Sequence, residues 1–581
     1  MKKILPIIII TCALALAISS VWEDSLIVDE IPHVGAGYSY WATGDMRLNP
    51  EHPPLVKDLA GLPLQFMDLE DEPAFASRFW NTDINGQWDF GRQLIFQSGN
   101  DADKVAHAAK PPVFIFFILA AWLLFKWIRE RYGFWPGIVG LILFTFSPTV
   151  LAHARFVTTD LAAAWGILTA TFFFLRYLEK PTWKNLLIAG LIFGLAQLTK
   201  FSVFLLVPYF GLLAIIWSLV KSRGFLAGAR VVLGTILLMV VGYGLVVWPV
   251  YGLHTRNYPV ELQQRDMQAQ IGYAKPEFAR QLVLALADKP YLRAFDQYLF
   301  GLLMVNQRQA GGNTIYYRGE VVQSGGPSYF PLVYFIKETL AFWAFVLLAL
   351  LGVFLTKNYK LKTINSIREH FPEWAMLLWL IIYWGISIQS KLNIGVRHLL
   401  PVFPFTIILV TAGIASLRNK LRIENKKILL SAFYFLISIL LGWQIYENVS
   451  IYPYYLTYFN QSAGGPENGY KIVVDSNLDW GQDLKRLTNF VEENNIEAIE
   501  VDYFGWSDPY YYLGQKTRWL HAGKYRSAAE FKASSQSDGW LALSATFKQN
   551  SKQNPATSYD WLDTYNPVAV IGHSIFVYHV K

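Results

Sequence analysis

The sequence predicts a polytopic all-α membrane protein of about 11 transmembrane helices, followed by a soluble α/β domain. Of its 581 residues, 53% are hydrophobic and 16% are charged, whereas soluble proteins average about 25% charged. The apolar residues gather in stretches of roughly 20, which is enough to cross a bilayer at about 1.5 Å per residue. The composition excludes disordered, fibrous and disulfide-rich secreted classes. Cys12 is the single cysteine, so no internal disulfide and no cysteine zinc cluster can form.

The predicted spans lie near 4–21, 111–128, 134–152, 161–178, 186–199, 201–220, 231–251, 331–355, 374–390, 399–416 and 428–446. The first span has two interpretations. It is a cleavable signal peptide, with Ala15-Leu16-Ala17 resembling a cleavage site, or it is an uncleaved anchor. The anchor is favoured because the chain is polytopic and the apolar run continues to Val21.

Basic residues decide the orientation. With the N-terminus in the cytoplasm, 20 lysines and arginines lie at inner ends and loops, whereas 4 lie in the short outer loops. The inner residues are Lys2, Lys3, Lys126, Arg129, Arg131, Arg176, Lys180, Lys184, Lys221, Arg223, Arg230, Lys357, Lys360, Lys362, Arg368, Arg418, Lys420, Arg422, Lys426 and Lys427. This bias fits the positive-inside rule, so the net charge of +7 requires no nucleic-acid partner. We expect a bacterial inner-membrane protein with its C-terminal domain outside.

The same orientation divides the chain into two predicted domains. Residues 1–446 form the transmembrane domain, which includes long outside loops at about 22–110 and 252–330. Residues 447–581 form the outward-facing soluble domain. Its strand-like runs at 472–474, 499–501, 540–543 and 568–571, with a helix-like run at 482–494, predict an α/β fold. Residues 55–67 predict a short helix on the membrane surface.

Several charged residues lie beside predicted spans, where charge is costly and therefore points to function. Arg155 and Lys200 have a simpler explanation, because long basic side chains can extend to lipid headgroups. Asp160 can also cap the helix that follows it. However, all these residues fall on the outer face, in four different loops, which favours one shared site. They are Asp29, Glu30, Arg155, Asp160, Lys200, Lys391, Arg397 and His398.

Motifs around these charges resemble a known class. The first outer loop contains Asp29-Glu30-Ile31-Pro32-His33 and Asn49-Pro50-Glu51-His52-Pro53-Pro54. Together with four later stretches, these motifs resemble polyprenyl-phosphate-dependent glycosyltransferases of the GT-C class, in the protein O-mannosyltransferase-like and aminoarabinose-transferase-like branch. The resemblance covers residues 1 to about 485. The later stretches are Arg155–Asp160, Gly194–Lys200, Leu392–Pro401 and Asp475–Leu484.

The resemblance implies hexosyl or pentosyl transfer from a polyprenyl-phosphate donor to an acceptor hydroxyl, by an inverting single displacement at the outer membrane face. The acceptor would be a glycan, a lipid or a protein. No nucleotide cofactor is expected, because the sequence contains no GxGxxG or P-loop pattern.

The residue types fit that chemistry. Cations bind the departing phosphate, and the candidates are Lys57, Arg155, Lys200 and Arg397. A carboxylate accepts the acceptor's proton. By resemblance Asp29 is this base, while Glu30 and Asp160 orient or polarise the site.

A divalent metal is a further candidate. Glu51, His52 and His398 offer the oxygen and nitrogen ligands that suit zinc or manganese, although hydrogen bonds to loop backbone explain them equally well. The run Asp475–Asp483 fails the EF-hand calcium pattern, because glycine stands at the seventh position and Arg486 at the twelfth. Its acids are instead expected to begin a helix, whose dipole they complement.

Two other functions compete with the transferase. A transporter or flippase of polyprenyl-linked sugars would share the spans and the cations, but transporters usually have two related halves and charges near the bilayer midplane. Here the charges gather at one face and no repeat is present. A membrane-anchored binding protein would place function in the tail, whose aromatics can stack on sugars, but it would leave the outer-face charges unexplained.

Overall fold

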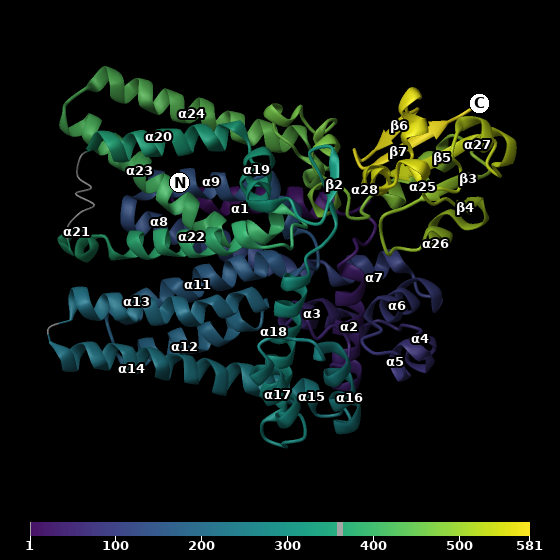
Figure 1. Ribbon diagram of the computed structural model, residues 1–581. Helices are drawn as coiled ribbons and strands as arrows, with labels where there is room; N and C mark the ends of the chain where they lie inside the picture. The colour runs from purple at the N-terminus through teal and green to yellow at the C-terminus, as the bar shows by residue number, and fades with distance from the viewer. Residues whose placement is uncertain (1, 223, 357–363) are drawn as a thin grey trace.

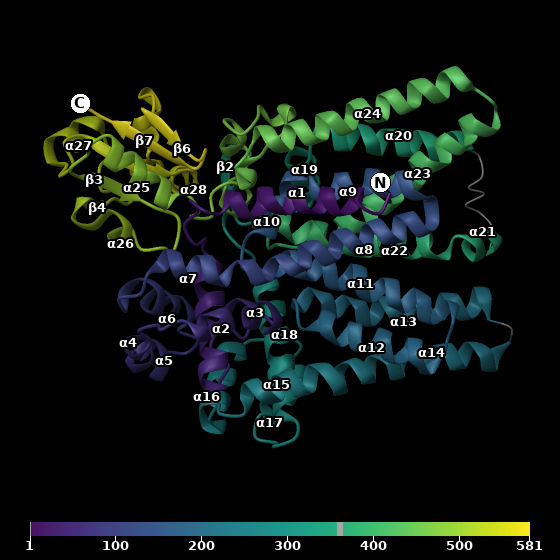
Figure 2. The ribbon, with the colours of Figure 1, turned by 180° about the vertical axis from the view of Figure 1, so that it is seen from behind.

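The computed structural model describes residues 2–222, 224–356 and 364–581. The basic residues Arg223, Lys357, Lys360 and Lys362, which we counted for the orientation, lie outside the described residues. The chain forms a bundle of long helices with two groups of shorter elements gathered at one end (Figure 1). The same division is visible from behind (Figure 2).

Thirteen of the described helices make up the bundle. They are α1 (Leu5–Ser20), α8 (Phe114–Tyr132), α9 (Phe134–Thr145), α10 (Pro148–Ala154), α11 (Thr159–Glu179), α12 (Trp183–Gln197), α13 (Leu206–Lys221), α14 (Phe225–Gly242), α19 (Tyr329–Lys337), α20 (Leu340–Thr356), α22 (Phe371–Gln389), α23 (Phe403–Ile423) and α24 (Lys427–Ser450). A short helix, α21 (Ile364–Glu369), precedes α22.

Among the described residues, 7 helices are long and apolar enough to cross a membrane, or up to 9 if each bent pair counts as one span. The bent pairs are α9 with α10, at 61°, and Gly326–Lys337 with Leu340–Leu355, at 106°. The two other predicted spans are the shorter apolar helices α1 and α12. Every predicted apolar segment is therefore helical, and the chain is an integral membrane protein.

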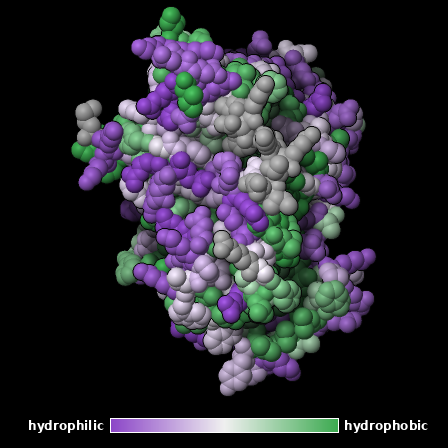
Figure 3. All heavy atoms as spheres, turned by 90° about the vertical axis from the view of Figure 1, so that its left-hand side faces the viewer, coloured by the Kyte–Doolittle hydropathy of each residue, from purple (hydrophilic) through white to green (hydrophobic). Residues whose placement is uncertain are grey.

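The two ends of the bundle differ in what they carry. The C-terminal ends of α13 and α23 and the starts of α14 and α24 lie at one end, whereas the C-terminus of the chain lies beyond the other (Figure 1). Hydrophilic side chains spread over much of the first end (Figure 3). The basic loops and the long outer segments are thus at opposite ends of the bundle, as the sequence predicts.

Two long connections build the region beyond the bundle. The first contains α2 (Glu30–Thr43), α3 (Leu55–Gly61), α4 (Glu72–Ala76), α5 (Arg78–Asn81), α6 (Gln87–Arg92) and α7 (Ala102–Ala109). The second contains α15 (Trp248–Thr255), α16 (Val260–Ile271), α17 (Glu277–Leu286), α18 (Arg293–Gly311) and the antiparallel hairpin of β1 (Ile315–Tyr317) and β2 (Glu320–Val322).

The predicted short helix at 55–67 is confirmed as α3, which is followed by a 3₁₀ turn at Pro63–Phe66. It packs closely on α2, because a Cβ at Gly61 would overlap the backbone of Gly37. Lys57 on this helix is fully buried. The basic side chain of α3 therefore faces protein rather than headgroups.

The C-terminal tail forms a five-stranded sheet in the order β4-β3-β5-β7-β6. Strand β3 is parallel to β4 and β5, whereas β7 is antiparallel to β5 and β6. The strands are β3 (Ile499–Asp502), β4 (Thr517–Trp519), β5 (Trp540–Ser544), β6 (Ala569–Ile571) and β7 (Ile575–His579). The helices are α25 (Leu484–Glu493), α26 (Pro509–Leu513), α27 (Ala528–Ser534) and α28 (Ala545–Asn550).

The predicted α/β class of the tail is confirmed, with one strand misplaced. Residues 472–474 form no strand, because Val473 makes a single isolated bridge, to Tyr317 of β1. Two strands were not predicted: β4 at one edge of the sheet, and β7, which pairs with two strands and is therefore interior to the sheet.

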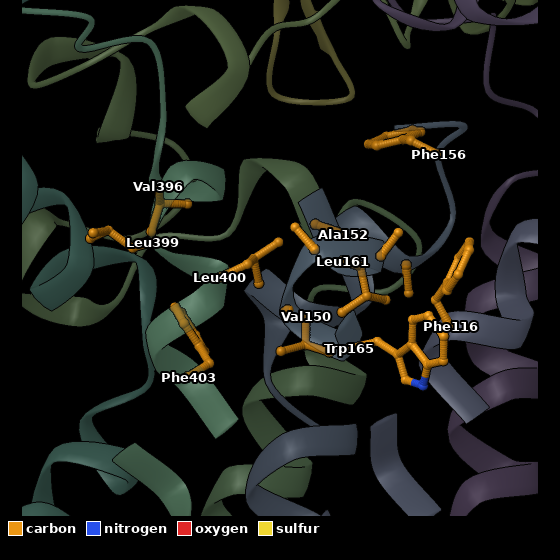
Figure 4. Close-up of a cluster of buried hydrophobic side chains, with 14 of the residues drawn as sticks. Phe116, Val150, Ala152, Phe156, Leu161, Trp165, Val396, Leu399, Leu400 and Phe403 are labelled. Atoms are coloured by element: carbon orange, nitrogen blue, oxygen red, sulfur yellow. The ribbon is translucent and has the colours of Figure 1, made fainter. Parts of the chain in front are cut away.

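A buried apolar cluster joins three segments that also carry charged residues (Figure 4). Val150 of α10, Leu161 of α11 and Leu400 from the turn before α23 are all at most 3% exposed. Packing at this density fixes backbone position. The polar residues next to these buried side chains therefore have fixed backbone positions.

Candidate active site

A cavity of about 240 Å³ opens at the end of the bundle that carries the two long connections, and residues of both connections line it. Its polar lining includes Asp29, Lys200 and Arg397. Another part of its wall is apolar, formed by Phe204 and Leu205, which lead into α13, and by residues such as Ile386 of α22. The cavity therefore joins a charged region to an apolar wall where two membrane helices end.

Four charged side chains form a continuous network at this cavity; three of them line it, whereas Asp160 is buried and does not. Arg397 Nη1 donates to Asp29 Oδ2 at 2.6 Å and lies 3.6 Å from Asp160 Oδ2. Lys200 Nζ donates to Asp160 Oδ1 at 2.5 Å. The order is thus Asp29–Arg397–Asp160–Lys200, assembled from four segments far apart in the sequence. The structure brings together four of the residues that the sequence predicts.

Local structure explains how each acid is presented. Asp29 immediately precedes α2 but makes no capping bond, so its carboxylate is free to meet Arg397. Asp160 lies in the first turn of α11, where a negative charge complements the helix dipole. The cap position itself is Thr158, so capping does not explain Asp160. Asp160 is 1% exposed and Asp29 is 21% exposed, which makes Asp29 the more accessible acid.

Arg397 and Lys200 stand in turns that precede membrane helices. Arg397 belongs to the 3₁₀ turn Val396–Val402, whose apolar residues lie in the buried cluster of Figure 4. The indole ring of Trp480 lies 4.1 Å from its guanidinium carbon. Lys200 precedes the 3₁₀ turn Phe201–Leu205 in extended conformation. Both cations thus occupy fixed backbone positions at the cavity.

Glu30 is fully buried and does not line the cavity. It accepts hydrogen bonds from the backbone amides of Ile27, at 3.0 Å, and Val157, at 2.9 Å. Lys110 Nζ lies 3.3 Å away. Burial raises the pKa of Glu30, and the Lys110 charge opposes that rise. Its contacts join the first outer loop to the α10–α11 connection, which is a positioning role rather than contact with substrate.

Lys57 also lies away from the cavity. Its ammonium is fully buried and donates to four oxygens, which belong to Tyr40, Asn49 and the His52 carbonyl. Burial lowers the pKa of Lys57 to about 7. Its hydrogen bonds hold the turn that carries His52, so Lys57 shapes the cavity wall without reaching a ligand there.

Arg155 is likewise outside the cavity and is 1% exposed. It pairs with Asp24 at 2.9 Å and donates to the carbonyls of Ser20 and Pro453. Arg486 of α25 lies on the other side of Asp24, at 2.7 Å. The structure gives Arg155 protein partners instead of a phosphate, which argues against its predicted direct contact with the donor.

The predicted metal ligands line the cavity but do not form a metal site. Glu51 accepts from Gln87 at 2.6 Å and from Asn85 at 3.3 Å. The ring of His52 packs edge-on against His33, with centroids 4.9 Å apart. Within the described ranges, no group of three or more His, Cys, Asp or Glu side chains is placed to hold a metal ion. These residues therefore do not fit the predicted metal, and we assign no step to one.

Two residues beside the network were not predicted. Arg308, in the last turn of α18, is exposed, lines the cavity and makes no ion pair with any described residue. Charges are ordinary in a long outer loop, so the sequence gave little reason to select it. Trp480 lies in the tail run Asp475–Leu484, whose resemblance to the family was the available signal.

Comparison with known proteins supports the class. Residues 102–243 match the family described as dolichyl-phosphate-mannose-protein mannosyltransferase. This segment, about a quarter of the chain, includes Asp160 and Lys200, and its match confirms the predicted resemblance there. No curated protein matches the chain.

Solved structures align over most of the chain at low identity. ArnT from Cupriavidus metallidurans bound to undecaprenyl phosphate is 14% identical, with a TM-score of 0.42, covering 98% of this chain and 97% of that one. The Archaeoglobus fulgidus oligosaccharyltransferase is 13% identical in its apo form, with a TM-score of 0.46, covering 94% and 70%. Its complex with Zn and sulfate is also 13% identical, with a TM-score of 0.43, covering 92% and 68%. These TM-scores are too low to support an argument about function.

The class of the protein therefore rests on two findings. It is an integral membrane protein whose apolar helices carry a charged cavity at one end. The segment 102–243 matches a mannosyltransferase family and supplies half of the charged network. Together they indicate a membrane glycosyltransferase.

Proposed function

We propose that the protein transfers a sugar from a polyprenyl-phosphate donor to an acceptor hydroxyl at the outer face of a bacterial inner membrane. The observation that carries this proposal is the cavity itself. It combines the carboxylate of Asp29 with cations and an apolar wall at the ends of α13 and α22. An amphiphile with a phosphate head and an isoprenoid tail is complementary to these cations and to this apolar wall.

Asp29 is the general base in this proposal. Its Oδ2 accepts from Arg397, and no bond from a described residue occupies Oδ1. Oδ1 can therefore take the proton of an acceptor hydroxyl as its oxygen attacks the anomeric carbon. A carboxylate in this role typically contributes about 10²–10⁴-fold to rate. Asp160 is unsuited to it, because Lys200 and Arg397 both pair with it.

The leaving group is polyprenyl phosphate, which departs with the electron pair of the broken bond to the anomeric carbon. Lys200, Arg308 and Arg397 line the cavity and would stabilise that anion. Arg308 is the cation best placed to accept it, since the other two already face carboxylates. A single displacement by an external hydroxyl inverts the anomeric centre, and no covalent enzyme intermediate is required.

The test of the reaction uses the purified full-length chain and a polyprenyl-phosphate donor with a radiolabelled sugar. We expect label to move from lipid to a water-exposed acceptor, and free polyprenyl phosphate to accumulate in equal amount. Movement of intact labelled lipid across a vesicle membrane, without cleavage, would instead support the transporter.

The orientation has a separate test. With Cys12 replaced by serine, a cysteine at Ser222 should resist a membrane-impermeant thiol reagent added to intact cells. A cysteine at Ser462, in the exposed tail, should react. The opposite labelling pattern would place the cavity on the cytoplasmic side and refute the proposed donor geometry.

A further inference from the structure

One segment of the tail contacts Arg397 directly and is hydrogen-bonded to the backbone immediately before Asp29, the other member of the ion pair. We call residues 475–482, which lead into α25, the strap. The strap is almost entirely buried, and Trp480 at its centre is 1% exposed. It does not line the cavity. Its contacts therefore cannot be explained by direct binding of a ligand in the cavity.

On one side the strap is bonded to the backbone that precedes Asp29. The amide of Val28 donates to the Trp480 carbonyl at 2.9 Å, and the amide of Ser25 donates to the Gln482 carbonyl at 2.9 Å. Two backbone bonds at this spacing leave little freedom for the intervening chain. The position of the Asp29 carboxylate is thus set by the tail as well as by α2.

On the other side the strap holds the turn that carries Arg397. The Trp480 ring lies 4.1 Å from the Arg397 guanidinium carbon, which is a cation–π contact. Asn477 Oδ1 accepts from the Val396 amide at 2.9 Å, and the Ser476 hydroxyl bonds to the Ile394 carbonyl. The backbone approaches so closely here that a Cβ at Gly395, whose φ is 151°, would overlap Ser476.

The strap is in turn fixed to the folded tail. Asp479 accepts from the Thr546 amide at 3.0 Å, and the Thr546 hydroxyl accepts from the Asp475 amide at 3.1 Å. Thr546 belongs to α28, directly after β5. The strap is therefore a rigid link from the α/β domain to the cavity.

We propose that Trp480 is a positioning residue for Arg397, and that through it the C-terminal domain is a required part of the active site. This inference rests on the proposed function, because it assigns Arg397 to the binding of the donor phosphate. The indole face holds the guanidinium plane so that its Nη1 meets Asp29 and its charge faces the cavity. Without the ring, the arginine keeps its charge but loses its fixed direction.

The experiment is a double-mutant cycle on the detergent-purified full chain, with binding of undecaprenyl phosphate as the readout. Binding is compared among wild type, Trp480→Leu, Arg397→Ala and the double variant. We expect each single change to weaken binding about tenfold, the size of a desolvated cation–π contact. The double variant should bind no more weakly than Arg397→Ala, because residues that act through each other are not additive.

Two further variants separate positioning from general damage to the fold. Trp480→Phe keeps a ring over Arg397 and should recover most of the binding. Phe531→Leu removes a fully buried aromatic of the same domain, remote from the strap, and should leave binding unchanged. The inference is overturned if Trp480→Leu binds like wild type, or if it weakens binding by the same factor with and without Arg397.

Failure of the proposed function would look different. If wild type does not bind undecaprenyl phosphate, the proposed donor class is refuted. The same cycle is then measured on the thermal unfolding midpoint, which needs no ligand. Additive shifts of the midpoint would overturn the inference, whereas non-additive shifts recovered by Trp480→Phe would support it.

Discussion

Two clusters of alternating acids and bases lie close together at the end of the bundle that carries the cavity. The cavity cluster is Asp29, Arg397, Asp160 and Lys200. The buried cluster is Asp24, Arg155, Arg486 and Asp483, in which Arg486 bridges the two acids at 2.7 and 2.5 Å. Only four residues separate Asp24 from Asp29. The first cluster borders a cavity, whereas the second is enclosed between the membrane helices and the tail.

The two clusters have the same residue types and differ in their access to the cavity, which is why we assign the proposed reaction to the first and a structural role to the second. Asp24 is completely buried and Arg155 is 1% exposed, so their charges are matched to each other and reach no ligand. Removing one residue of such a pair leaves the charge of the other unpaired in a medium of low dielectric. Asp29, at 21% exposure, has its charge balanced by Arg397 on one side and faces open space on the other. Substitutions in the two clusters should therefore fail in different ways.

The largest expected effect is on catalysis, at Asp29. Asp29→Asn keeps the side-chain shape but cannot accept a proton, so sugar transfer should fall by about 10²–10⁴-fold. Binding of undecaprenyl phosphate should change little. Glu30→Gln is the neighbouring control, and it should reduce stability while leaving the turnover of folded protein near normal. Normal turnover in a folded Asp29→Asn variant would remove Asp29 as the base.

The next effect is on stability, at Arg155. Arg155→Ala leaves Asp24 short of a partner in the buried cluster, which should reduce the free energy of unfolding by about 3–5 kcal/mol. The apparent KM for donor should not change in the protein that remains folded. Thermal unfolding together with donor kinetics at low temperature measures both quantities. A raised KM without loss of stability would mean that Arg155 contacts the phosphate after all.

Smaller effects are expected at the cavity cations. Lys200→Ala and Arg308→Ala should each raise the KM for donor about 10- to 150-fold, the equivalent of about 1.5–3 kcal/mol for a charge-assisted hydrogen bond. Lys391→Ala is the matched control, since Lys391 lies in an outer loop but does not line the cavity. If the KM for donor is unchanged in Arg308→Ala, as it should be in the control, Arg308 is excluded from the phosphate site.

The smallest effect concerns pH. Burial holds the pKa of His52 well below its usual range, and the nearby His33, Lys57, Lys200 and Arg308 act in the same direction. Below about pH 6.5 the unfolded chain binds a proton at His52 that the folded chain does not, so stability falls as pH falls. The slope should be about 1.4 kcal/mol per pH unit. His52→Gln should reduce the total slope between pH 7 and 5 by about this amount, because burial also lowers the pKa of His33, which contributes a slope of its own. His521→Gln, at an exposed site, should leave the slope unchanged.

Sequence reasoning predicted the membrane part well because long apolar runs have few alternatives to helix in a bilayer. It also located the outer-face acids and bases, since charge beside a span is costly wherever it occurs. It could not distinguish Arg155 from Arg397. Both are outer-face arginines, and only the three-dimensional position of Asp24 reveals that Arg155 is already neutralised.

The tail was predicted less completely, for a related reason. Strand β7 pairs with β5 and, across a short turn, with β6. Its β-branched and aromatic residues are typical of a strand, so the local pattern was present and was overlooked. Residues 472–474 have the composition of a strand but meet a partner at one residue only. In the sequence, Trp480 has the properties of an ordinary core aromatic, and only its contact with Arg397 in the structure indicates another role. Contacts with segments elsewhere in the chain decide the last two cases.

The strap has a consequence for biosynthesis. Asp29 and Arg397 are 368 residues apart in the sequence, and Trp480 is made later still. Translation proceeds at roughly 5–20 residues per second, so Asp29, the proposed base, is synthesised about 20–90 seconds before Trp480, the residue proposed to position Arg397. A nascent or truncated chain thus has the membrane helices without an organised site. Catalytic competence would then be acquired only by molecules whose last domain has been completed and folded.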